Sequence, residues 1–436
     1  MPHDLTPDRF RAALPAEGLF ADKEWRHSPR PFPLTAGFVD ELERLGFRLS
    51  KLQRACNLLY RLSLRGKQPA WIAECLDAGK PAQLIEISRA RALVDDLPRV
   101  IRPDLLLTES GMTIAELDSV PGGMGLTGWL GETYAAGGWD IVGGPEGMID
   151  GFQALMPEGG TLLVSDESAT YRPEMQWIAR RVGDRNPELR WAIENPATWV
   201  PSGVAHNVYR FFELFDLPNL PAAGALLDAT ASGVIRMTPP PKPQLEEKLW
   251  FALFWMRPLR EFWRRELGER HWLALQQVIP RTWLLDPTPL PHHGEIPGLD
   301  VQSWAQLAEF TQKERQLLLK VSGFSERAWG SRGVVVGSDI PHMEWAGALR
   351  TALEEFPVHP WILQRFHHSR LLDHPYFDPD DASERTLRGR VRLCPYFFIE
   401  ADRAVLRGVL ATICPADKKL IHGMRDAILV PAAVEG

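Results

Sequence analysis

The sequence predicts a mixed helix and strand (α+β) protein with several domains, and three observations lead to this expectation. The first is length, because 436 residues correspond to roughly three domains of about 150 residues each. The second is a change of pattern near residue 100, from apolar residues at helical spacing to short apolar runs separated by glycine and proline. The third is composition, because 45% hydrophobic and 24% charged residues are typical of folded globular chains.

The N-terminal region is expected to be mainly helical over residues 1–100. Between residues 36 and 65, apolar side chains recur at spacings of three and four, which is the stripe of an amphipathic helix pair. These side chains are Phe38, Leu42, Leu45, Leu49, Leu52, Cys56, Leu59 and Leu62.

Strands and helices alternate after residue 101, which indicates an α/β domain over 101–236. The apolar run TLLVSDE (161–167), for example, precedes the helical pattern YRPEMQWIARRVGD. The segment MTPPPKPQ (237–244) cannot sustain a helix or a central strand, so we expect a domain boundary there and a further domain over 245–436. In that last domain a helical block precedes the strand candidates, which are 316–321, 333–337, 361–366, 391–400 and 404–414.

Charge and cysteine content limit the classes of partner and compartment. The formal net charge is −7, so no global basic excess favours nucleic acid or an anionic membrane, and small-molecule partners are expected. Four cysteines without a C-x-x-C pair indicate reduced thiols in an intracellular protein. The N-terminus lacks the apolar region of a secretory signal, and the apolar run 249–256 is too short to span a bilayer. We therefore expect a soluble, cytoplasmic protein, with its oligomeric state left open.

The stretch RPDLLLTESGMTIAELDSVPGG (102–123) is the most informative segment of the chain. Two apolar runs flank the sequence from Glu109 to Gly111, which predicts a hairpin with a three-residue loop whose last position favours glycine. This loop pairs Thr108 with Met112, and the same register brings four charged residues to one face. The opposed pairs are Asp104 with Glu116 and Arg102 with Asp118.

The three carboxylates of this hairpin are candidate metal ligands. Two carboxylates about 5 Å apart repel by about 3 kcal/mol at an effective dielectric near 20, so some positive charge must offset the repulsion. Three acids and one arginine leave a net charge of −2, which matches a hard divalent cation such as Mg²⁺ held by Asp104, Glu116 and Asp118. The alternative is an ordinary hairpin with a solvated acidic end. A loop of different length would also separate Asp104 from Glu116.

A second cluster lies in LLLKVSGFSERAWGSRGVVVG (317–337). A strand ends at Lys320, a loop rich in glycine and serine follows, and a β-branched strand begins at Gly333. Such a loop, with Gly330 and Ser331 in it, could fold over a polyphosphate through its backbone N–H groups. It lacks the P-loop sequence, so a surface hairpin with a chance lysine is the alternative.

These two segments together resemble the circularly permuted ATP-grasp ligases, specifically the synthetase domain of glutathionylspermidine synthase. The resemblance rests on R-x-D, eleven intervening residues, and E-x-D followed by Pro-Gly, and it extends over residues 100–436. The further matching segments are VYRFFELFDL (208–217), GALLDATASGVIRM (224–237), EEKLWFAL (246–253), the Lys320 hairpin, WILQRF (361–366) and VLRGVLATI (405–413).

The resemblance implies an ATP-grasp α+β fold with two lobes around the nucleotide and an α/β acceptor-side domain. It implies an ADP-forming carboxylate–amine ligase in which Asp104, Glu116 and Asp118 hold Mg²⁺ between the ATP phosphates. The residues it places at ATP or the transferred phosphoryl group are Arg102, Lys248, Lys320, the Gly330–Ser331 and Gly333 loop, Gln364 and Arg407, with Arg425 competing for the role of Arg407.

Two departures from the family pattern limit this transfer. Asp118 replaces the family asparagine and adds a negative charge, and Lys248 follows two glutamates where the family has N-K. No segment of the chain indicates a binding pocket for glutathione or a polyamine, so the resemblance does not identify the substrates.

Two rival functions remain open from the residues alone. A nucleotide-binding protein without turnover would keep the same phosphate contacts. The string G-M-G-L-T-G from Gly123 through Gly125 to Gly128, with Asp140 following, also matches a dinucleotide-binding fingerprint and would indicate an NAD-linked oxidoreductase. Against it, Ser-Val-Pro separates the strand from the first glycine, and several further glycines occupy the expected helix.

Overall fold

The computed structural model describes residues 3–15, 24–118, 120–202, 206–328, 332–419, 421 and 426–435. The chain divides into two compact units, each assembled from separate stretches. Unit 1 comprises Met1–Ser50, Ala90–Pro240 and His368–Gly436, and unit 2 comprises Lys51–Arg89 and Pro241–His367. One of the divisions therefore falls inside the proline-rich segment.

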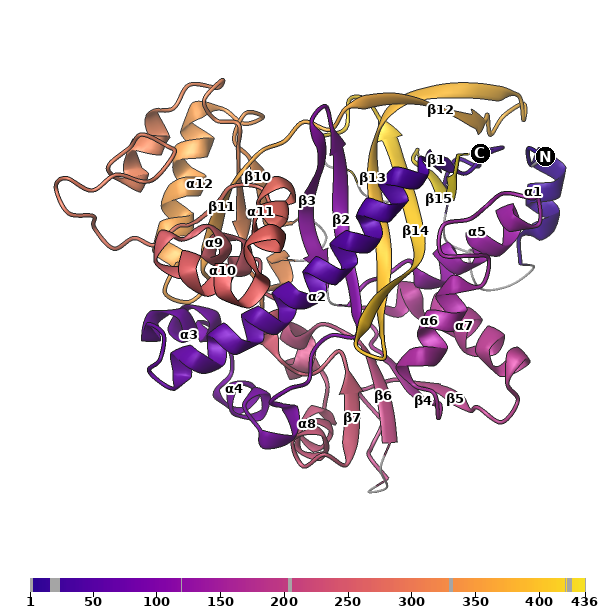
Figure 1. The fold of residues 1–436 in the computed structure, drawn as a ribbon, viewed down its shortest axis with the longest axis horizontal. Coiled ribbons are helices and arrows are strands. Elements are labelled where there is room, and N and C mark those ends of the chain that lie inside the picture. Colours follow the sequence, from indigo (N-terminus) through magenta and orange to yellow (C-terminus); the bar gives the residue numbers. More distant parts are fainter. Residues whose placement is uncertain are drawn as a thin grey trace. The chain divides into compact units, whose positions relative to one another are not determined.

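The main element of unit 1, within the described residues, is a seven-stranded sheet in the order β1-β15-β14-β13-β2-β3, with β12 paired to β13. Its strands are β1 (Phe32–Leu34), β2 (Val100–Thr108), β3 (Gly111–Asp118), β12 (Leu371–Phe377), β13 (Glu384–Glu400), β14 (Arg403–Pro415) and β15 (Ile428–Val434). Neighbouring strands are antiparallel, except that β1 is parallel to β15. Figure 1 shows β2 and β3 beside β13.

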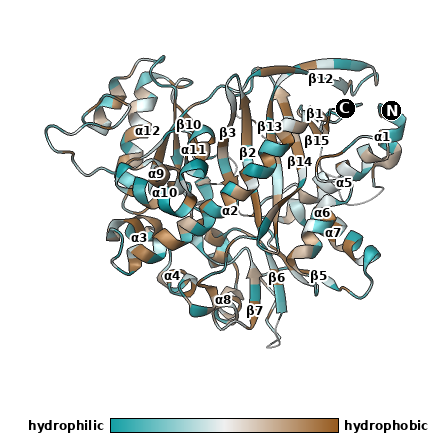
Figure 2. Cartoon of the chain, in the orientation of Figure 1, coloured by the Kyte–Doolittle hydropathy of each residue, from teal (hydrophilic) through white to brown (hydrophobic). Residues whose placement is uncertain are grey.

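Helix α2 (Ala36–Leu64) is one continuous helix of 29 residues, whereas the sequence predicted a helix pair in this region. Its apolar stripe continues without a break, and Figure 2 shows hydrophobic and hydrophilic residues alternating along it. Gly46 does not interrupt the helix. A Cβ at this position would lie 2.4 Å from the Phe397 ring, so glycine allows α2 to approach β13 closely.

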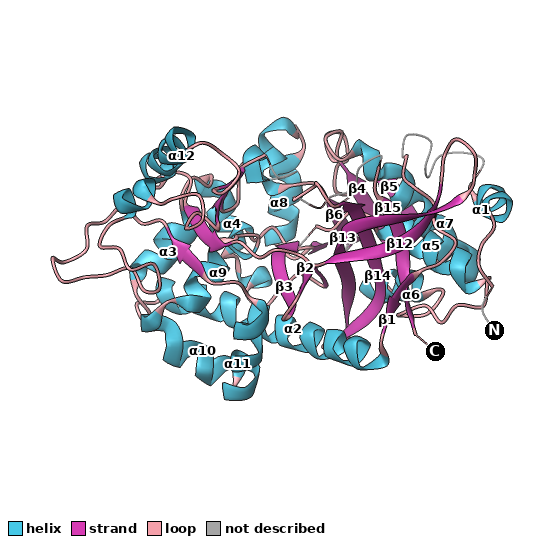
Figure 3. Ribbon diagram, turned by 90° about the horizontal axis from the view of Figure 1, so that it is seen from above, coloured by secondary structure: helices cyan, strands magenta, loops and turns pink. Residues whose placement is uncertain are grey.

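Helices cover both faces of the seven-stranded sheet. Gly151 of helix α6 (Gly147–Leu155) approaches the Phe398 ring as Gly46 approaches that of Phe397. Because adjacent side chains on a strand point to opposite faces, α2 and α6 pack on opposite sides of β13. Figure 3 shows α2 along one side of this sheet.

Unit 1 also contains a four-stranded parallel sheet in the order β5-β4-β6-β7 within the described residues. Its strands are β4 (Gly160–Val164), β5 (Trp191–Glu194), β6 (His206–Phe211) and β7 (Ile235–Thr238). The remaining helices of this unit are α1 (Pro7–Ala13), α5 (Met124–Ala135), α7 (Arg172–Arg185) and α8 (Ala223–Ala231). The alternation of strands and helices expected over 101–236 is thus present.

Unit 2 is built on an antiparallel sheet in the order β10-β9-β11-β8 among the described residues. Its strands are β8 (Thr282–Leu284), β9 (Leu317–Val321), β10 (Val334–Val336) and β11 (Trp361–Arg365). Its helices, besides the C-terminal part of α2, are α3 (Ala70–Asp77), α4 (Ala82–Ser88), α9 (Leu249–Trp255), α10 (Arg260–Leu267), α11 (Glu269–Val278) and α12 (His342–Glu355).

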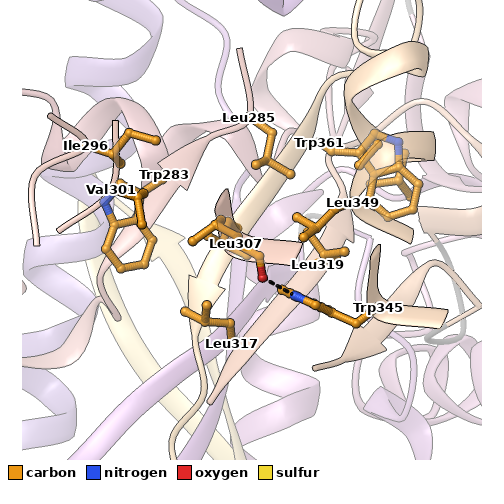
Figure 4. Close-up of a cluster of buried hydrophobic side chains, with 13 residues drawn as sticks. Trp283, Leu285, Ile296, Val301, Leu307, Leu317, Leu319, Trp345, Leu349 and Trp361 are labelled. Atoms are coloured by element: carbon orange, nitrogen blue, oxygen red, sulfur yellow. Dashed lines mark hydrogen bonds between the residues drawn. The ribbon is translucent and has the colours of Figure 1, made fainter. Parts of the chain in front are cut away.

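The two faces of the unit 2 sheet differ in polarity. Odd-numbered residues of β9 and β11, such as Leu319 and Leu363, join a buried apolar cluster with Trp345 of α12, whose indole donates to the Leu307 carbonyl (Figure 4). Even-numbered residues therefore point to the other face, and several of these are polar. In the described part of the chain, no helix combines the length and apolar character needed to cross a bilayer.

Candidate functional site

The β2–β3 hairpin brings the predicted charged residues opposite one another, although by a different route from the expected one. Thr108 pairs with Gly111, so the turn contains two residues rather than three, and the expected pairing of Thr108 with Met112 is wrong. The register then shifts by one residue between Asp104 and Leu105, which leaves Ala115 as a β-bulge. The bulge restores the pairs Asp104 with Glu116 and Arg102 with Asp118.

Arg102 lies at the centre of the resulting cluster. It donates from Nη2 to Asp118 Oδ2 at 2.7 Å and from Nη1 to the Gly122 carbonyl at 3.1 Å. Its Nε lies 3.2 Å from Asp104 Oδ1. A second guanidinium, that of Arg392 on β13, donates to Asp104 Oδ2 at 2.9 Å. Asp104 is therefore held between two arginines.

Burial and the two arginines set the electrostatics of this cluster. Burial disfavours the charge on Arg102, but Asp104 and Asp118 outweigh this effect and raise the pKa of its guanidinium well above its ordinary value. Burial also raises the pKa of Asp118, against the opposing effect of Arg102. The Cys394 thiol donates to Asp104 Oδ1 at 3.3 Å, and burial raises the pKa of this thiol to about 12. Cys394 is therefore a packed, protonated group rather than a nucleophile.

The carboxylates of this cluster do not form a ready metal site. Within the ranges that the structure describes, no group of three His, Cys, Asp or Glu side chains is arranged to hold a metal ion. Both oxygens of Asp104 face guanidinium groups, and Asp118 accepts from Arg102 and from the Val120 backbone N–H. The donor set in this arrangement thus fits two arginines and not Mg²⁺, and Asp104, Glu116 and Asp118 as metal ligands stay a prediction.

Arg407 does not join the Arg102 cluster. Its guanidinium makes a bidentate ion pair with Glu400, in which Nε and Nη2 each donate to a carboxylate oxygen at 2.7 Å. Its Nη1 lies 3.4 Å from Asp150 Oδ2 of α6. Glu400 and Asp150 thus neutralise the guanidinium that the sequence analysis expected to contact the transferred phosphoryl group. Arg425, the alternative residue for that role, lies outside the described residues.

In unit 2, Lys320 and Gln364 lie on the polar face of the sheet. Lys320 Nζ donates to Gln364 Oε1 at 2.8 Å, and Gln364 Nε2 donates to Thr282 Oγ1 at 3.3 Å. Thr282 and Gln364 are direct cross-strand partners, and Lys320 lies on the diagonal, within reach of a long side chain. All three are buried. Two of the residues assigned to the nucleotide are thus in direct contact.

The segment that follows β9 contains the other nucleotide-binding candidates. Lys248 donates from Nζ to the Ala328 carbonyl at 3.1 Å. Gly333 accepts from the Val321 backbone N–H at 3.3 Å, and a Cβ there would lie 2.7 Å from the Arg327 carbonyl, so only glycine fits. Gly330 and Ser331 lie outside the described residues.

Three contributors to these clusters were not predicted from the sequence. Lys80 forms an ion pair with Glu247, and both side chains are almost completely buried. Arg392 holds Asp104, as described above. Lys80 lies between two short helices and Arg392 on a strand, and their partners are 167 and 288 residues away along the chain. Contacts between residues so far apart in the chain cannot be predicted from the sequence around either residue.

Buried cations outnumber buried acids in unit 2. Among its described residues, the buried charged side chains are Lys80, Lys242, Arg315 and Lys320, which are cations, and Glu247, the one acid. Each of these cations has a polar partner within the unit: Lys80 pairs with Glu247, Lys242 with Asn57, Arg315 with the Ile340 carbonyl and Lys320 with Gln364.

The glycine string after β3 packs helices together and does not form a dinucleotide site. Strand β3 is antiparallel to β2 and ends the strand order, so the described residues contain no parallel crossover unit around α5. The Leu126 N–H at the start of α5 donates to the buried Glu174 carboxylate at 3.1 Å, where a pyrophosphate would be expected. A Cβ at Gly125 would lie 2.6 Å from the Glu174 carbonyl, and one at Gly128 2.7 Å from the Trp177 ring. These contacts argue against the oxidoreductase alternative.

Comparison with known proteins gives a fold and no sequence family. No protein-family model and no curated protein sequence matches the chain. Among solved structures, a glutathione synthetase-like effector from Globodera pallida, in its apo form, is similar over 94% of this chain and 90% of its own, with a TM-score of 0.54 and 11% identity. A proposed gamma-glutamylcysteine synthetase from Methylobacillus flagellatus is similar over 90% and 87%, with a TM-score of 0.39 and 12% identity.

The first likeness shows a shared fold, whereas a TM-score below 0.5 does not establish one. The mixed α and β architecture agrees with the expected ATP-grasp-like fold, and circular permutation stays a prediction. The chain thus shares the fold of a glutathione synthetase-like protein.

Proposed function

We propose that the chain is an ATP-dependent ligase that joins a carboxylate to an amine with formation of ADP and phosphate. The observation that carries the proposal is the contact between the buried Lys320 and Gln364 side chains on the polar face of the unit 2 sheet. A phosphate oxygen is a suitable acceptor for the Lys320 ammonium group, and Gln364 supplies both a donor and an acceptor for a nucleobase edge. The fold shared with a glutathione synthetase-like effector supports the same class of protein.

The proposed chemistry has two balanced steps. A substrate carboxylate oxygen attacks the γ-phosphorus of ATP, the bond to the β-phosphate oxygen breaks, and ADP leaves with that electron pair. The amine nitrogen then attacks the acyl carbon of the acylphosphate, phosphate leaves, and the nitrogen loses a proton to give the amide. Neither step needs a nucleophilic side chain, so positioning and charge stabilisation carry catalysis.

Each predicted site residue has a proposed role in this reaction. Lys320, Lys248 and Gln364 contact the nucleotide, together with the segment from Gly330 and Ser331 to Gly333. Arg102, a permanently charged guanidinium, stabilises the transferring phosphoryl group. Arg407 is a candidate for a second phosphate contact once it exchanges its acidic partners.

Magnesium is part of the proposal through the resemblance and not through the observed geometry. When bound to the nucleotide, Mg²⁺ neutralises phosphate charge. Asp104, Glu116 and Asp118 would hold it only after their oxygens part from the arginines. We therefore assign no step to the ion.

A second candidate function is nucleotide binding without turnover. The observation that favours it is that the Asp104 carboxylate is occupied by Arg102 and Arg392. A protein that keeps the lysines proposed to bind ATP, but whose carboxylates remain paired with arginines, would bind ATP and release no ADP.

Calorimetric titration with ATP and a coupled assay for ADP, run with and without Mg²⁺, test the proposal. Lys320→Met should weaken ATP binding about 10- to 100-fold, because a charge-assisted hydrogen bond contributes about 1.5–3 kcal/mol. The exposed Lys313→Met is the matched control and should bind ATP as the wild type does. Equal affinity in both variants would remove Lys320 from the site.

Two variants of the hairpin separate ligase activity from binding alone. Arg102→Ala should keep ATP affinity within about threefold and abolish ADP release, and Glu116→Ala should lose the Mg²⁺-dependent part of ATP binding. Thermal unfolding of both variants checks that the fold persists, because Arg102→Ala removes the guanidinium partner of Asp118 and one of the two guanidinium groups at the buried Asp104. ATP binding with no ADP release across a broad acid and amine panel would favour the second candidate.

A further inference from the structure

The Lys80–Glu247 ion pair meets the segment that follows β9. Lys80 Nζ pairs with Glu247 Oε1, and Ser322 Oγ donates to the other carboxylate oxygen, Oε2. The side chains of Lys80 and Glu247 are 1% and 2% exposed. One carboxylate therefore connects a lysine from the helical part of unit 2 to the first residue after the strand that carries Lys320.

The following residues fit closely around the same pair. A Cβ at Gly323 would lie 2.9 Å from Glu247 Oε1, so glycine is needed for the chain to pass the carboxylate. Phe324 adopts a φ of 42°, a left-handed conformation that is costly for an aromatic residue, and its ring lies 6.0 Å from Lys80 Nζ. Such a conformation persists where the surrounding structure holds it, and here the preceding Gly323 passes against Glu247 while the Phe324 ring lies beside the Lys80 ammonium group.

The segment is also anchored on both sides of this contact. The Leu249 N–H donates to Ser322 Oγ at 2.9 Å, and the Ser322 N–H donates to the Pro360 carbonyl at 3.0 Å. At its far end, Lys248 Nζ reaches the Ala328 carbonyl at 3.1 Å. The described segment 322–328 thus has a fixed start, a strained residue beside the ion pair, and a lysine-bound end.

We propose that Lys80 and Glu247 are positioning residues that fix the segment 322–328 for the nucleotide. The inference rests on the proposed function for the identity of the ligand, whereas the ordering of the segment does not. Because Lys80 and Glu247 neutralise each other, Lys80 acts on the nucleotide through the segment, whereas Lys320 and Lys248 are the cations proposed to contact it.

A rival role for Lys80 makes the opposite prediction for Glu247. If Lys80 itself bound a phosphate, Glu247 would compete with the ligand for its ammonium. Removal of the carboxylate charge in Glu247→Gln would then strengthen ATP binding, while Lys80→Met would weaken it. If the pair positions the segment, both substitutions weaken ATP binding.

The test measures amide hydrogen exchange of residues 322–328 in the full chain without nucleotide, and ATP affinity by calorimetry. We expect Lys80→Met and Glu247→Gln each to accelerate exchange of the segment at least tenfold and to weaken ATP binding about tenfold. Lys67→Met and Glu74→Gln, which change exposed residues of the same unit, should alter neither quantity. Lys80→Arg, which keeps the ion pair, should restore most of the protection.

A double variant guards against loss of the fold, because a single substitution leaves one buried charge unpaired. Lys80→Met with Glu247→Gln removes both charges and should accelerate exchange no more than either single change does. Unchanged exchange of 322–328 in the double variant would overturn the inference, as would tighter ATP binding by Glu247→Gln. If the wild type binds no ATP, the proposed function fails, and the exchange data still decide whether the pair orders the segment.

Discussion

At the scale of single residues, several buried charged side chains find their partners far away along the sequence. Asp104 illustrates the point, because its position opposite Glu116 follows from the hairpin, whereas its partner Arg392 arrives from a strand 288 residues later. The sequence analysis counted one arginine near three acids, and the structure has two. The expected net charge of −2 is therefore −1 for these five side chains.

A buried histidine makes the free energy of unfolding of unit 1 depend on pH. His374 is 3% exposed, and its Nε2 lies 3.1 Å from Ser28 Oγ. Burial lowers the pKa of this imidazole to about 4 from its ordinary 6.5. The unfolded chain therefore takes up a proton near pH 6.5 that the folded chain accepts only near pH 4. Unfolding free energy should fall by up to about 3 kcal/mol as the pH drops through this window.

His374→Gln should reduce this slope, as measured by urea unfolding at several pH values between 7 and 4. The slope should decrease and not vanish, because burial, together with Arg11, also lowers the pKa of His27 to about 4. His292→Gln removes an exposed imidazole and should leave the slope as in the wild type. An unchanged slope in His374→Gln would show that this histidine does not resist protonation in the folded chain.

At the scale of elements, local patterns identified several of the strands, whereas the register of the hairpin was predicted incorrectly. The apolar runs 316–321, 361–366 and 404–414 correspond to β9, β11 and β14. The hairpin was correct at Asp104 because two errors compensate: the turn is one residue shorter than expected, and the bulge at Ala115 adds one residue back. A bulge depends on twist and on packing against neighbouring strands, which a single segment does not encode.

Glycines in helices were misjudged for a related reason. Propensity alone marks a glycine as a helix breaker, whereas in α5 the missing side chain allows close packing on α7. The sequence analysis counted Gly131, Gly137 and Gly138 against a crossover helix, whereas the observed helix runs from Met124 to Ala135, includes Gly131 and ends before the other two. The tertiary packing contacts of α5 therefore outweigh the low helix propensity of its glycines.

Substitution of these glycines gives a test with a built-in control. Gly125→Ala would place a Cβ 2.6 Å from the Glu174 carbonyl, which is backbone and cannot move away cheaply. It should destabilise the chain by about 1–3 kcal/mol in urea unfolding. Gly183→Ala on α7 meets nothing within 4 Å and should be neutral or stabilising by up to about 1 kcal/mol. Equal effects of the two changes would refute the packing argument.

At the scale of the whole molecule, the chain passes between the two units four times. Neither unit is a continuous stretch of sequence, and for this reason composition and linkers could not define them. Residues 51–89 belong to unit 2 and supply Lys80 to Glu247 and Asn57 to Lys242, whose Nζ donates to Asn57 Oδ1 at 3.1 Å. Helices α3 and α4 and the C-terminal part of α2 are therefore part of the unit that carries Lys320, Lys248 and Gln364.

This organisation predicts that the fragment 241–367 does not fold cooperatively alone. Without residues 51–89, Glu247 and Lys242 lose their buried partners, and the Val358 carbonyl loses its contact with Gly79, which packs against it without room for a side chain. A chain that joins 51–89 to 241–367 through a flexible Gly/Ser linker of about 20 residues, with an r.m.s. span of about 25 Å, should restore a single urea transition. Circular dichroism would measure both proteins. In the joined chain, Lys80→Met should lower the midpoint and the exposed Lys67→Met should not. A cooperative transition of 241–367 alone, at the urea midpoint of the joined chain, would contradict this prediction. It would mean that residues 51–89, and with them the Lys80–Glu247 ion pair, contribute nothing to the stability of unit 2.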